Sequence, residues 1–504
     1  MTDGASLNRA SDPGGMSGDR SRWIALVVLC VGMLMIVLDQ TIVNVALPSI
    51  KNDLGFSQST LAWVVNAYLI TFGGLLLLAG RLGDLIGRKT VFMVGLGLFT
   101  AASALCAIAQ TQEMLVGARF LQGVGGATTS AVILGMIVTM FPQPREQAKA
   151  IGVYSFVASA GASIGLLLGG LLTQALNWHW IFFVNLPIGV LTAVGAARVV
   201  QRDEGVGMRH GTDVLGAALI TAALMLGVYT IVKPAADDGW GAPLTIALGA
   251  ASLALIAAFV AREAKARTPL VPLRIFRNRN VSGANVIQAL FIAAMFGMFF
   301  LGSLYLERVL GYDPLQIGLA FLPIALAIGV LSLGFSERLA MRFGAKPTLL
   351  TGLVLIAGGL VLWATLPIHA RYVGDLLAPL LLLGVGAGLS FPSLMRLAMS
   401  SSTQEDSGLA SGLVNTSLQV GGALGLAVLA TLSANRTDNL VAAGSSRNAA
   451  LTSGLHLACW IGAGLVVAAI AVTALIVRPG PAAQAADRTE SAELAAAATY
   501  SNAA

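Results

Sequence analysis

Long apolar segments recur along the whole chain. A helix needs about 20 apolar residues to cross the hydrocarbon layer of a membrane, and the sequence contains fourteen stretches of that kind. They are runs of Leu, Ala, Val and Gly without alternation of polar and apolar residues, which argues against a membrane β-barrel. The candidate spans are 23–47, 61–80, 90–110, 114–139, 150–174, 180–200, 212–232, 243–261, 283–305, 316–336, 348–366, 375–399, 408–434 and 454–477.

The overall composition excludes a water-soluble protein. Of the 504 residues, 56% are apolar and only 11% are charged, and the mean hydropathy is +0.82. A soluble chain of this length needs far more charge to cover its surface. We therefore expect an all-α polytopic protein embedded in a lipid bilayer.

The basic residues predict how the chain is oriented. If the spans alternate in direction, 23 of the 30 Lys and Arg residues lie on the side of the N-terminus, 6 lie on the opposite side, and Arg119 falls within a span. Because cytoplasmic loops carry an excess of Lys and Arg, we expect both termini to be cytoplasmic. The preference for Arg over Lys is typical of a high-GC bacterium, which predicts the bacterial inner membrane. The net charge of +6 follows from this topology and gives no indication of nucleic acid.

Cysteine and histidine usage predicts neither a disulfide framework nor a metal site. The three cysteines lie in apolar spans, and the four histidines have no metal-ligand spacing. The N-terminal segment has no apolar region separate from the first span, so we expect no cleaved signal peptide. The Ala-rich, polar residues 478–504 are expected to form a disordered tail.

One charged segment is repeated in the two halves of the chain. Residues 80–89 (GRLGDLIGRK) and 337–346 (ERLAMRFGAK) both lie between apolar spans. A membrane chain that repeats such a segment is most simply a duplicated helical bundle. Four positions match at an offset of 257: Arg81 with Arg338, Leu82 with Leu339, Gly87 with Gly344, and Lys89 with Lys346.

The repeat predicts the order of the domains. Between its two copies the spans advance by eight, whereas direct duplication of a six-helix unit advances them by six. Two extra spans, 212–232 and 243–261, therefore lie between two six-helix bundles. The predicted units are a cytoplasmic tail (1–22), an N-terminal bundle (23–200), a linker with two extra helices (201–282), a C-terminal bundle (283–477) and a second cytoplasmic tail (478–504).

The segment 80–89 has the composition of a turn between two helices. Its glycines allow a tight turn and close helix approach. Its single acid can accept hydrogen bonds at a helix start or pair with a neighbouring Arg. An ordinary basic loop is the alternative, but three glycines and one acid at this spacing favour a conformational hinge. The residues assigned to it are Gly80, Arg81, Gly83, Asp84, Gly87 and Arg88.

Asp39 is a carboxylate well inside the first span. A charge at mid-membrane costs on the order of 2.5–3.5 kcal/mol on insertion scales and usually marks a functional pathway. A medium of low dielectric constant favours the neutral form of a carboxylic acid. Asp39 is thus predicted to bind and release a proton. The alternative is a structural acid bonded to neighbours such as Gln40 or Thr41.

Arg119 is the basic counterpart, inside the fourth span. It shares one helical face with Gln122, Gly123 and Gly126. If Arg119 lies near Asp39, their interaction would set when the acid binds a proton. A contact that merely stabilises the bundle is the alternative.

Further polar and small residues mark other spans. The fifth span carries a glycine stripe, which lets helix backbones approach closely in lipid but is common in any bundle. The thirteenth span carries two amides four residues apart. The stripe consists of Gly152, Gly161, Gly165, Gly169 and Gly170. The candidate substrate-cavity residues are Asn44, Trp63, Tyr68, Gln122, Asn415 and Gln419.

Together these residues resemble the fourteen-span drug:proton antiporters of the major facilitator superfamily, the EmrB/QacA-type branch. The resemblance extends over residues 23–477. Residue Leu166 departs from the branch, which usually has Pro at that position in the fifth helix. The matching segments are LDQTIVNVALP at 38–48, the segment 80–89, Arg119-x2-Gln122-Gly123, the glycine stripe, and Gly412-Leu413-Val414-Asn415-x3-Gln419-x-Gly421-Gly422.

The resemblance implies a major facilitator fold of two six-helix bundles plus two linker helices, working by alternating access. It implies a monomer, driven by the proton gradient without a cofactor, in which Asp39 and Arg119 couple proton movement to export of amphipathic organic compounds such as antibiotics, drugs or biocides. The tenth span, 316–336, lacks the acid that some members use for cationic substrates.

Three other classes of function are alternatives to drug export. A proton-coupled importer, or an exporter of one specific metabolite, would have the same topology. A membrane sensor or scaffold would favour a large loop or an appended soluble domain, whereas the longest loops between spans have about twenty residues. A membrane enzyme would need clustered catalytic or metal-binding residues, which the spans lack.

Overall fold

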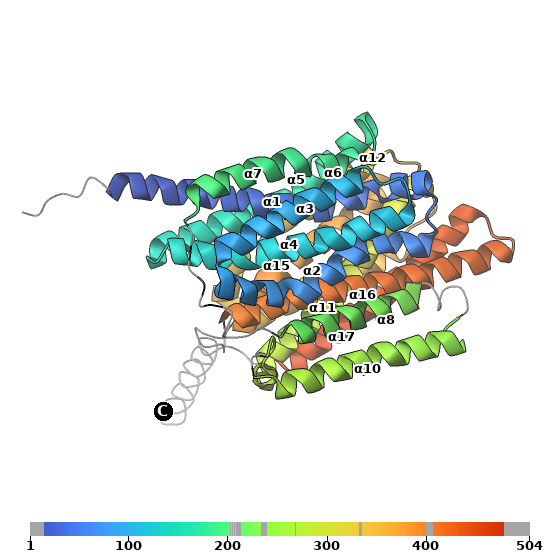
Figure 1. Ribbon diagram of the computed structural model, residues 1–504. Coiled ribbons are helices and arrows are strands. Elements are labelled where there is room, and N and C mark those ends of the chain that lie inside the picture. Colours follow the sequence, from blue (N-terminus) through green and yellow to red (C-terminus); the bar gives the residue numbers. More distant parts are fainter. Residues whose placement is uncertain are drawn as a thin grey trace, which may run out of the picture.

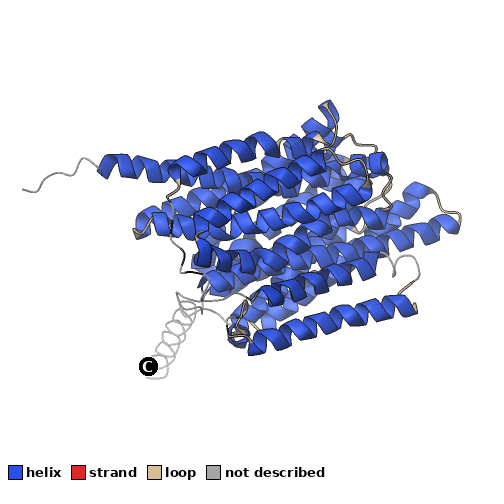
Figure 2. Ribbon diagram, viewed as in Figure 1, coloured by secondary structure: helices blue, strands red, loops and turns tan. Residues whose placement is uncertain are grey.

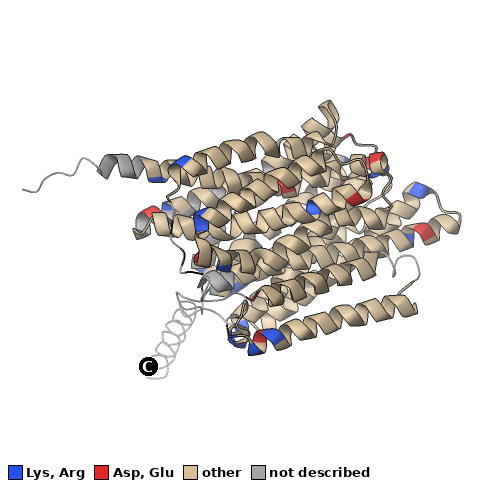
Figure 3. Cartoon of the chain, in the orientation of Figure 1, with Lys and Arg blue, Asp and Glu red and all other residues tan. Residues whose placement is uncertain are grey.

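The computed structural model describes residues 15–201, 203, 205, 207, 213–232, 239–267, 269–331, 335–399 and 407–477. Within these ranges the regular structure is helical, without a strand, and most helices run side by side in one bundle (Figure 1, Figure 2). Charged residues lie mostly toward the ends of the helices, and most of the helix length is uncharged (Figure 3). The predicted all-α membrane architecture is confirmed.

The helices correspond closely to the predicted spans. In chain order they are α1 (Gly15–Leu54), α2 (Gln58–Ile86), α3 (Arg88–Ala107), α4 (Gln112–Met140), α5 (Pro144–Ala175), α6 (Trp180–Phe183), α7 (Asn185–Val199), α8 (Val214–Val232), α10 (Pro243–Lys265), the 3-10 turn η2 (Leu273–Arg277), α11 (Arg279–Arg308), α12 (Pro314–Val330), α13 (Ser336–Phe343), α14 (Ala345–Trp363), the π-helical turn η4 (Tyr372–Leu376), α15 (Leu377–Met399), α16 (Ser407–Ala442) and α17 (Arg447–Leu475). We call α1–α7 the first half and α11–α17 the second half.

Local sequence explains several helix starts. The Ser57 hydroxyl accepts a hydrogen bond from the backbone N–H of Thr60, and the Thr60 hydroxyl accepts one from the Ser57 N–H. Asp313 and Gln316 form the same reciprocal cap before α12. Each cap satisfies backbone donors that have no partner inside the helix. These caps position the first turns of α2 and α12.

The number of full-length spans differs from the prediction. In the described ranges, twelve helices are long and apolar enough to cross a membrane, rather than fourteen. Of the other two predicted spans, 150–174 lies within α5, and Ile164–Ala175 is the apolar second part of that helix. The span 316–336 begins in α12, which passes into a π-helical residue at Leu331.

The first helix begins before the predicted first span. Helix α1 begins at Gly15, so residues 15–22 of the predicted N-terminal tail are helical. Residues 1–14 and the predicted disordered tail 478–504 lie outside the described residues. The start of α1 and the end of α17 lie at the same end of the bundle, which we call the termini end (Figure 1).

The predicted turn over 80–89 is wrong for most of its length. Helix α2 continues to Ile86, so Gly80, Arg81, Gly83 and Asp84 are helical. The turn is a single residue, Gly87, whose φ of 96° is open to glycine but strained for other residues. The reason is that the backbone N–H of Gly87 still bonds to Gly83, which keeps the last turn of α2 closed.

The two extra helices lie on one side of the bundle. Helix α8 packs against both α2 and α16, and α10 packs against α8 (Figure 1). The Thr431 hydroxyl of α16 donates to the Ile231 carbonyl of α8 at 3.3 Å. A Cβ on Gly74 of α2 would lie 2.5 Å from the Thr221 hydroxyl of α8. Helix α8 therefore covers the seam between the two halves.

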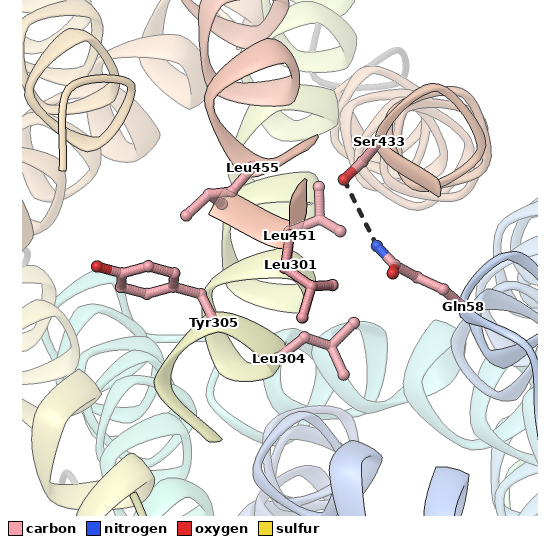
Figure 4. A pocket seen from close by; sticks show the side chains of 7 residues that line it. All are labelled: Gln58, Leu301, Leu304, Tyr305, Ser433, Leu451 and Leu455. Carbon is pink, nitrogen blue, oxygen red and sulfur yellow. Dashed lines mark hydrogen bonds between the residues drawn. The ribbon is translucent and has the colours of Figure 1, made fainter. Parts of the chain in front are cut away.

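At the end opposite the termini, polar contacts join the two halves. Asn52 after the apolar part of α1 donates to Glu307 at 3.1 Å and accepts from Arg308 at 2.9 Å. Figure 4 shows a small apolar pocket nearby, at whose edge Gln58 of α2 donates to Ser433 of α16 at 3.5 Å. The halves are therefore in contact at this end.

Candidate functional site

A buried ion pair lies between α1 and α4. The Nη1 of Arg119 is 2.6 Å from the Oδ2 of Asp39, and the two side chains are 1% and 0% exposed. The two residues that the sequence singled out as the buried acid and the buried base thus form one site.

The second carboxylate oxygen of Asp39 is bonded to amides. The Nε2 of Gln122 donates to Oδ1 at 2.7 Å, and the Nδ2 of Asn185 donates to the same atom at 3.0 Å. The two amides also donate to the hydroxyl of Ser103, at 2.8 Å and 3.4 Å. Both oxygens of the buried carboxylate therefore accept hydrogen bonds, from three donors in all.

Arg119 has neutral acceptors besides the carboxylate. Its Nε donates to the Val64 carbonyl at 2.9 Å, and its Nη1 donates to the Gln122 Oε1 at 2.6 Å. The guanidinium carbon lies 4.4 Å from the centre of the Tyr68 ring. The cation therefore keeps two hydrogen bonds and an aromatic face if the carboxylate becomes neutral.

A proton on Asp39 would remove the charge that compensates the Arg119 guanidinium. Breaking a buried ion pair in this way costs about 3–5 kcal/mol, because the remaining charge stays buried. Val64 and Gln122 would still accept hydrogen bonds from Arg119. The charge balance of the site therefore depends on the Asp39 carboxylate.

Glycines bring the helices of this site together. A Cβ on Gly126 of α4 would lie 2.9 Å from the Tyr68 hydroxyl of α2. A Cβ on Gly123 would clash with the backbone carbonyl of Tyr68. Helix α4 can therefore approach α2 closely enough for Arg119 to reach Val64.

The glycine stripe of α5 faces two helices. Gly161, Gly165 and Gly169 pack against α1, where a Cβ on Gly169 would lie 2.8 Å from the Ile42 carbonyl. Gly170 instead faces α12 in the second half, where a Cβ on Gly170 would lie 2.7 Å from the Pro314 carbonyl. The side-chain surroundings of Gly152 lie outside the described residues.

The hinge residues lie at the termini end, where they join three helices. Asp84 and Arg88 form an ion pair at 3.0 Å, and Arg88 also donates to the Gly135 carbonyl of α4 at 3.0 Å. A Cβ on Gly83 would lie 2.5 Å from Val132 of α4. Helices α2, α3 and α4 are thus fastened together here.

A residue of the linker completes the hinge. The Asp203 carboxylate accepts hydrogen bonds from the backbone N–H groups of Arg88 at 2.7 Å and Lys89 at 3.0 Å. It caps the start of α3, where backbone donors have no partner in the helix. A Cβ on Gly87 would lie 2.7 Å from the Asp203 carbonyl, so only glycine fits the turn beneath it.

The candidate cavity residues separate into two groups. Tyr68 and Gln122 are fully buried beside the ion pair, and Gln419 is buried against Gly73 of α2. The others have partly or largely exposed surfaces: Asn44 and Trp63 are half-buried and Asn415 is exposed. The structure does not bring all six residues to one surface.

Sequence reasoning missed three residues of the site. Asn185 and Ser103 contact the ion-pair network directly, and the Cys106 thiol donates to the Gln122 Oε1 at 3.6 Å. The available signal was a polar side chain inside an apolar span, as for Asn185 in 180–200. That signal is weak, because Ser, Cys and Asn also occur in spans as packing residues.

Residues 29–426 match the Major Facilitator Superfamily. The chain is 36% identical to the puromycin resistance protein pur8 of Streptomyces alboniger, over 94% of this chain and 95% of that protein. It is also 36% identical to the cephamycin export protein CmcT of Amycolatopsis lactamdurans, over 86% and 89% of the two chains.

Solved structures agree on the fold. An inward-facing, unoccupied bacterial homologue of the human lysosomal transporter Spinster superposes with a TM-score of 0.64 at 15% identity, over 92% of this chain and 97% of that one. Both the matched sequence and the helical architecture lead to one conclusion: the chain belongs to the Major Facilitator Superfamily of membrane transporters.

Proposed function

We propose that this protein exports small organic antibiotics from a bacterial cytoplasm in exchange for protons. The buried Asp39–Arg119 pair carries the proposal, because a mid-membrane ion pair is costly and usually marks an ion pathway. The direction of transport is supported by the relatives, one named for puromycin resistance and one for cephamycin export.

In this mechanism the two halves, residues 23–200 and 283–477, rock about a central path. Asp39 takes up a proton from the outside and releases it to the cytoplasm when the halves change orientation. Each proton that moves inward gains about 2.3 kcal/mol per 100 mV of membrane potential. Arg119 favours release, because the charged carboxylate regains its ion pair.

The substrate is proposed to be amphipathic and to lack a double positive charge. The described part of α12, Pro314–Val330, holds no carboxylate that could receive a second cation. We assign contact with the substrate to Asn44, Trp63, Asn415 and Gln419. Their amides and indole offer hydrogen bonds within an apolar path.

The remaining features of the proposal follow from the same topology. Both termini lie in the cytoplasm, the protein resides in the bacterial inner membrane, and it functions as a monomer. Transport needs no cofactor, since the proton gradient supplies the free energy. The positive-inside distribution of Lys and Arg supports this orientation.

The test uses everted membrane vesicles, whose outer surface is the cytoplasmic one. Respiration acidifies the vesicle interior, and a pH-sensitive dye reports it. Adding puromycin or cephamycin C should restore dye fluorescence, as protons leave in exchange for substrate entering the lumen. Vesicles without the protein are the control. Lack of proton release with every compound, or loss of labelled substrate from the lumen, would contradict antiport and export respectively.

A further inference from the structure

Tyr68 links the buried ion pair to a partly exposed face of α1. Its ring lies over the Arg119 guanidinium, with 4.4 Å between the ring centre and the guanidinium carbon. Its hydroxyl accepts a hydrogen bond from the Nε2 of Gln40 at 3.3 Å. The side chain itself is fully buried.

Gln40 is next to Asp39 in sequence but faces another direction. Adjacent residues of a helix are about 100° apart around its axis, and Asp39 is fully buried whereas Gln40 is half-buried. Asn44, one turn later, is also half-buried and donates to the Gln40 carbonyl at 3.0 Å. The face formed by Gln40 and Asn44 is therefore the polar surface closest in sequence to the acid.

The space around Tyr68 is tightly limited. A Cβ on Gly126 would lie 2.9 Å from the Tyr68 hydroxyl and 3.0 Å from the ring of Phe72. The charged groups that face the Tyr68 side chain are Asp39 and Arg119. Tyr68 therefore lies against α4 at both Gly126 and Arg119, so a displaced hydroxyl shifts the ring relative to the guanidinium.

We infer that Tyr68 is a positioning residue that couples substrate on the Gln40–Asn44 face to the Asp39–Arg119 pair. A substrate with hydrogen-bonding groups competes for the Gln40 amide and releases the Tyr68 hydroxyl. The ring then shifts on the guanidinium, and Arg119 moves relative to Asp39. This inference rests on the proposed function, and it assigns the step at which substrate binding promotes proton exchange.

The experiment uses purified full-length protein in liposomes, with puromycin as the probe. Tyr68→Phe keeps the ring over Arg119 but removes the hydroxyl, and Gln40→Leu removes the other partner of the same hydrogen bond. Tyr229→Phe, on the exposed side of α8, is the matched control. Proton-driven uptake is measured for its kcat, its KM and its pH profile, together with substrate exchange at equal concentrations.

We expect Tyr68→Phe and Gln40→Leu each to lower kcat of proton-driven uptake roughly tenfold, the effect of one lost hydrogen bond. In Tyr68→Phe, KM and substrate exchange should stay near the wild-type values, and the pH profile should shift. Gln40→Leu should also raise KM, because it removes the amide that the substrate contacts. The double variant should lose no more than either single variant, because both remove one interaction. Tyr229→Phe should behave as the wild type.

Three results would overturn the inference. The first is a wild-type pH profile and kcat in Tyr68→Phe. The second is a rise in the KM of Tyr68→Phe without a change in its kcat. The third is a loss of kcat in the double variant that equals the product of the two single losses. A rise in KM alone would make Tyr68 a simple substrate contact. Absence of substrate-driven proton movement in the wild-type protein would instead refute the proposed function, so the two failures are distinguishable.

Discussion

Lys89 and Lys346 occupy equivalent positions in the two halves and make equivalent hydrogen bonds. Each follows the turn glycine at the start of its helix, and each reaches the C-terminal end of the last helix in its own half. The two acceptors in each half are three residues apart. Lys89 donates to the carbonyls of Ala197 and Val200, and Lys346 donates to those of Ala474 and Val477.

We expect the hydrogen bonds of Lys89 and those of Lys346 to contribute equally to the stability of the protein. The last carbonyls of a helix have no partner inside it, and a lysine that binds them also favours the helix dipole. Lys89→Met and Lys346→Met should each lower the free energy of unfolding by about 1–3 kcal/mol, the value for hydrogen bonds to a charged group. Thermal unfolding in detergent measures this.

The control for the lysines is Lys265→Met at the exposed end of α10, which should leave the melting temperature unchanged. An equal loss of stability in all three variants would assign the effect to general charge rather than to these bonds.

Gly87 is predicted to tolerate no side chain. Its φ of 96° is unfavourable for other residues, and a Cβ would lie 2.7 Å from the Asp203 carbonyl. Strain of this kind costs about 1–3 kcal/mol. Gly87→Ala should therefore lower the melting temperature, whereas Gly97→Ala in α3, where a Cβ meets nothing within 4 Å, should not. Equal melting temperatures for the two variants would contradict this.

Close approach between the halves gives a further prediction. A Cβ on Gly318 of α12 would lie 2.5 Å from the Leu166 carbonyl of α5, so Gly318→Ala must push the backbones apart. Overpacking of this kind costs about 1–3 kcal/mol. Uptake by the variant should fall, because the contact joins the two moving halves.

The matched control lies on the same helix. A Cβ on Gly329 meets nothing within 4 Å, so Gly329→Ala should transport as the wild type does. Normal transport and stability of Gly318→Ala would contradict this prediction, because α5 and α12 could then move apart without loss of transport.

Much of this arrangement could be predicted from the sequence. Membrane spans are long and uniformly apolar, so their positions follow from local composition. Asp39 and Arg119 stand out because each is charged inside such a span. Their pairing follows from the cost of leaving either one alone in the membrane.

Other features could not be predicted, because they depend on contacts between distant segments. The cap that Asp203 provides for α3 joins residues 115 positions apart. Asn185 reaches Asp39 across 146 positions, from a helix with no local mark of that role. The glycines and the acid of 80–86 suggested a turn, but the segment is helical and Gly83 packs against Val132 of α4.

The central claim is that Asp39 carries the proton, and Asp39→Asn tests it most directly. Asparagine keeps one oxygen that can accept from Arg119, but it cannot titrate and carries no charge to pair with the guanidinium. In liposomes containing purified protein, the variant should lose uptake driven by an imposed pH gradient while it still exchanges labelled for unlabelled substrate. Gradient-driven uptake by Asp39→Asn at the wild-type rate would contradict the account.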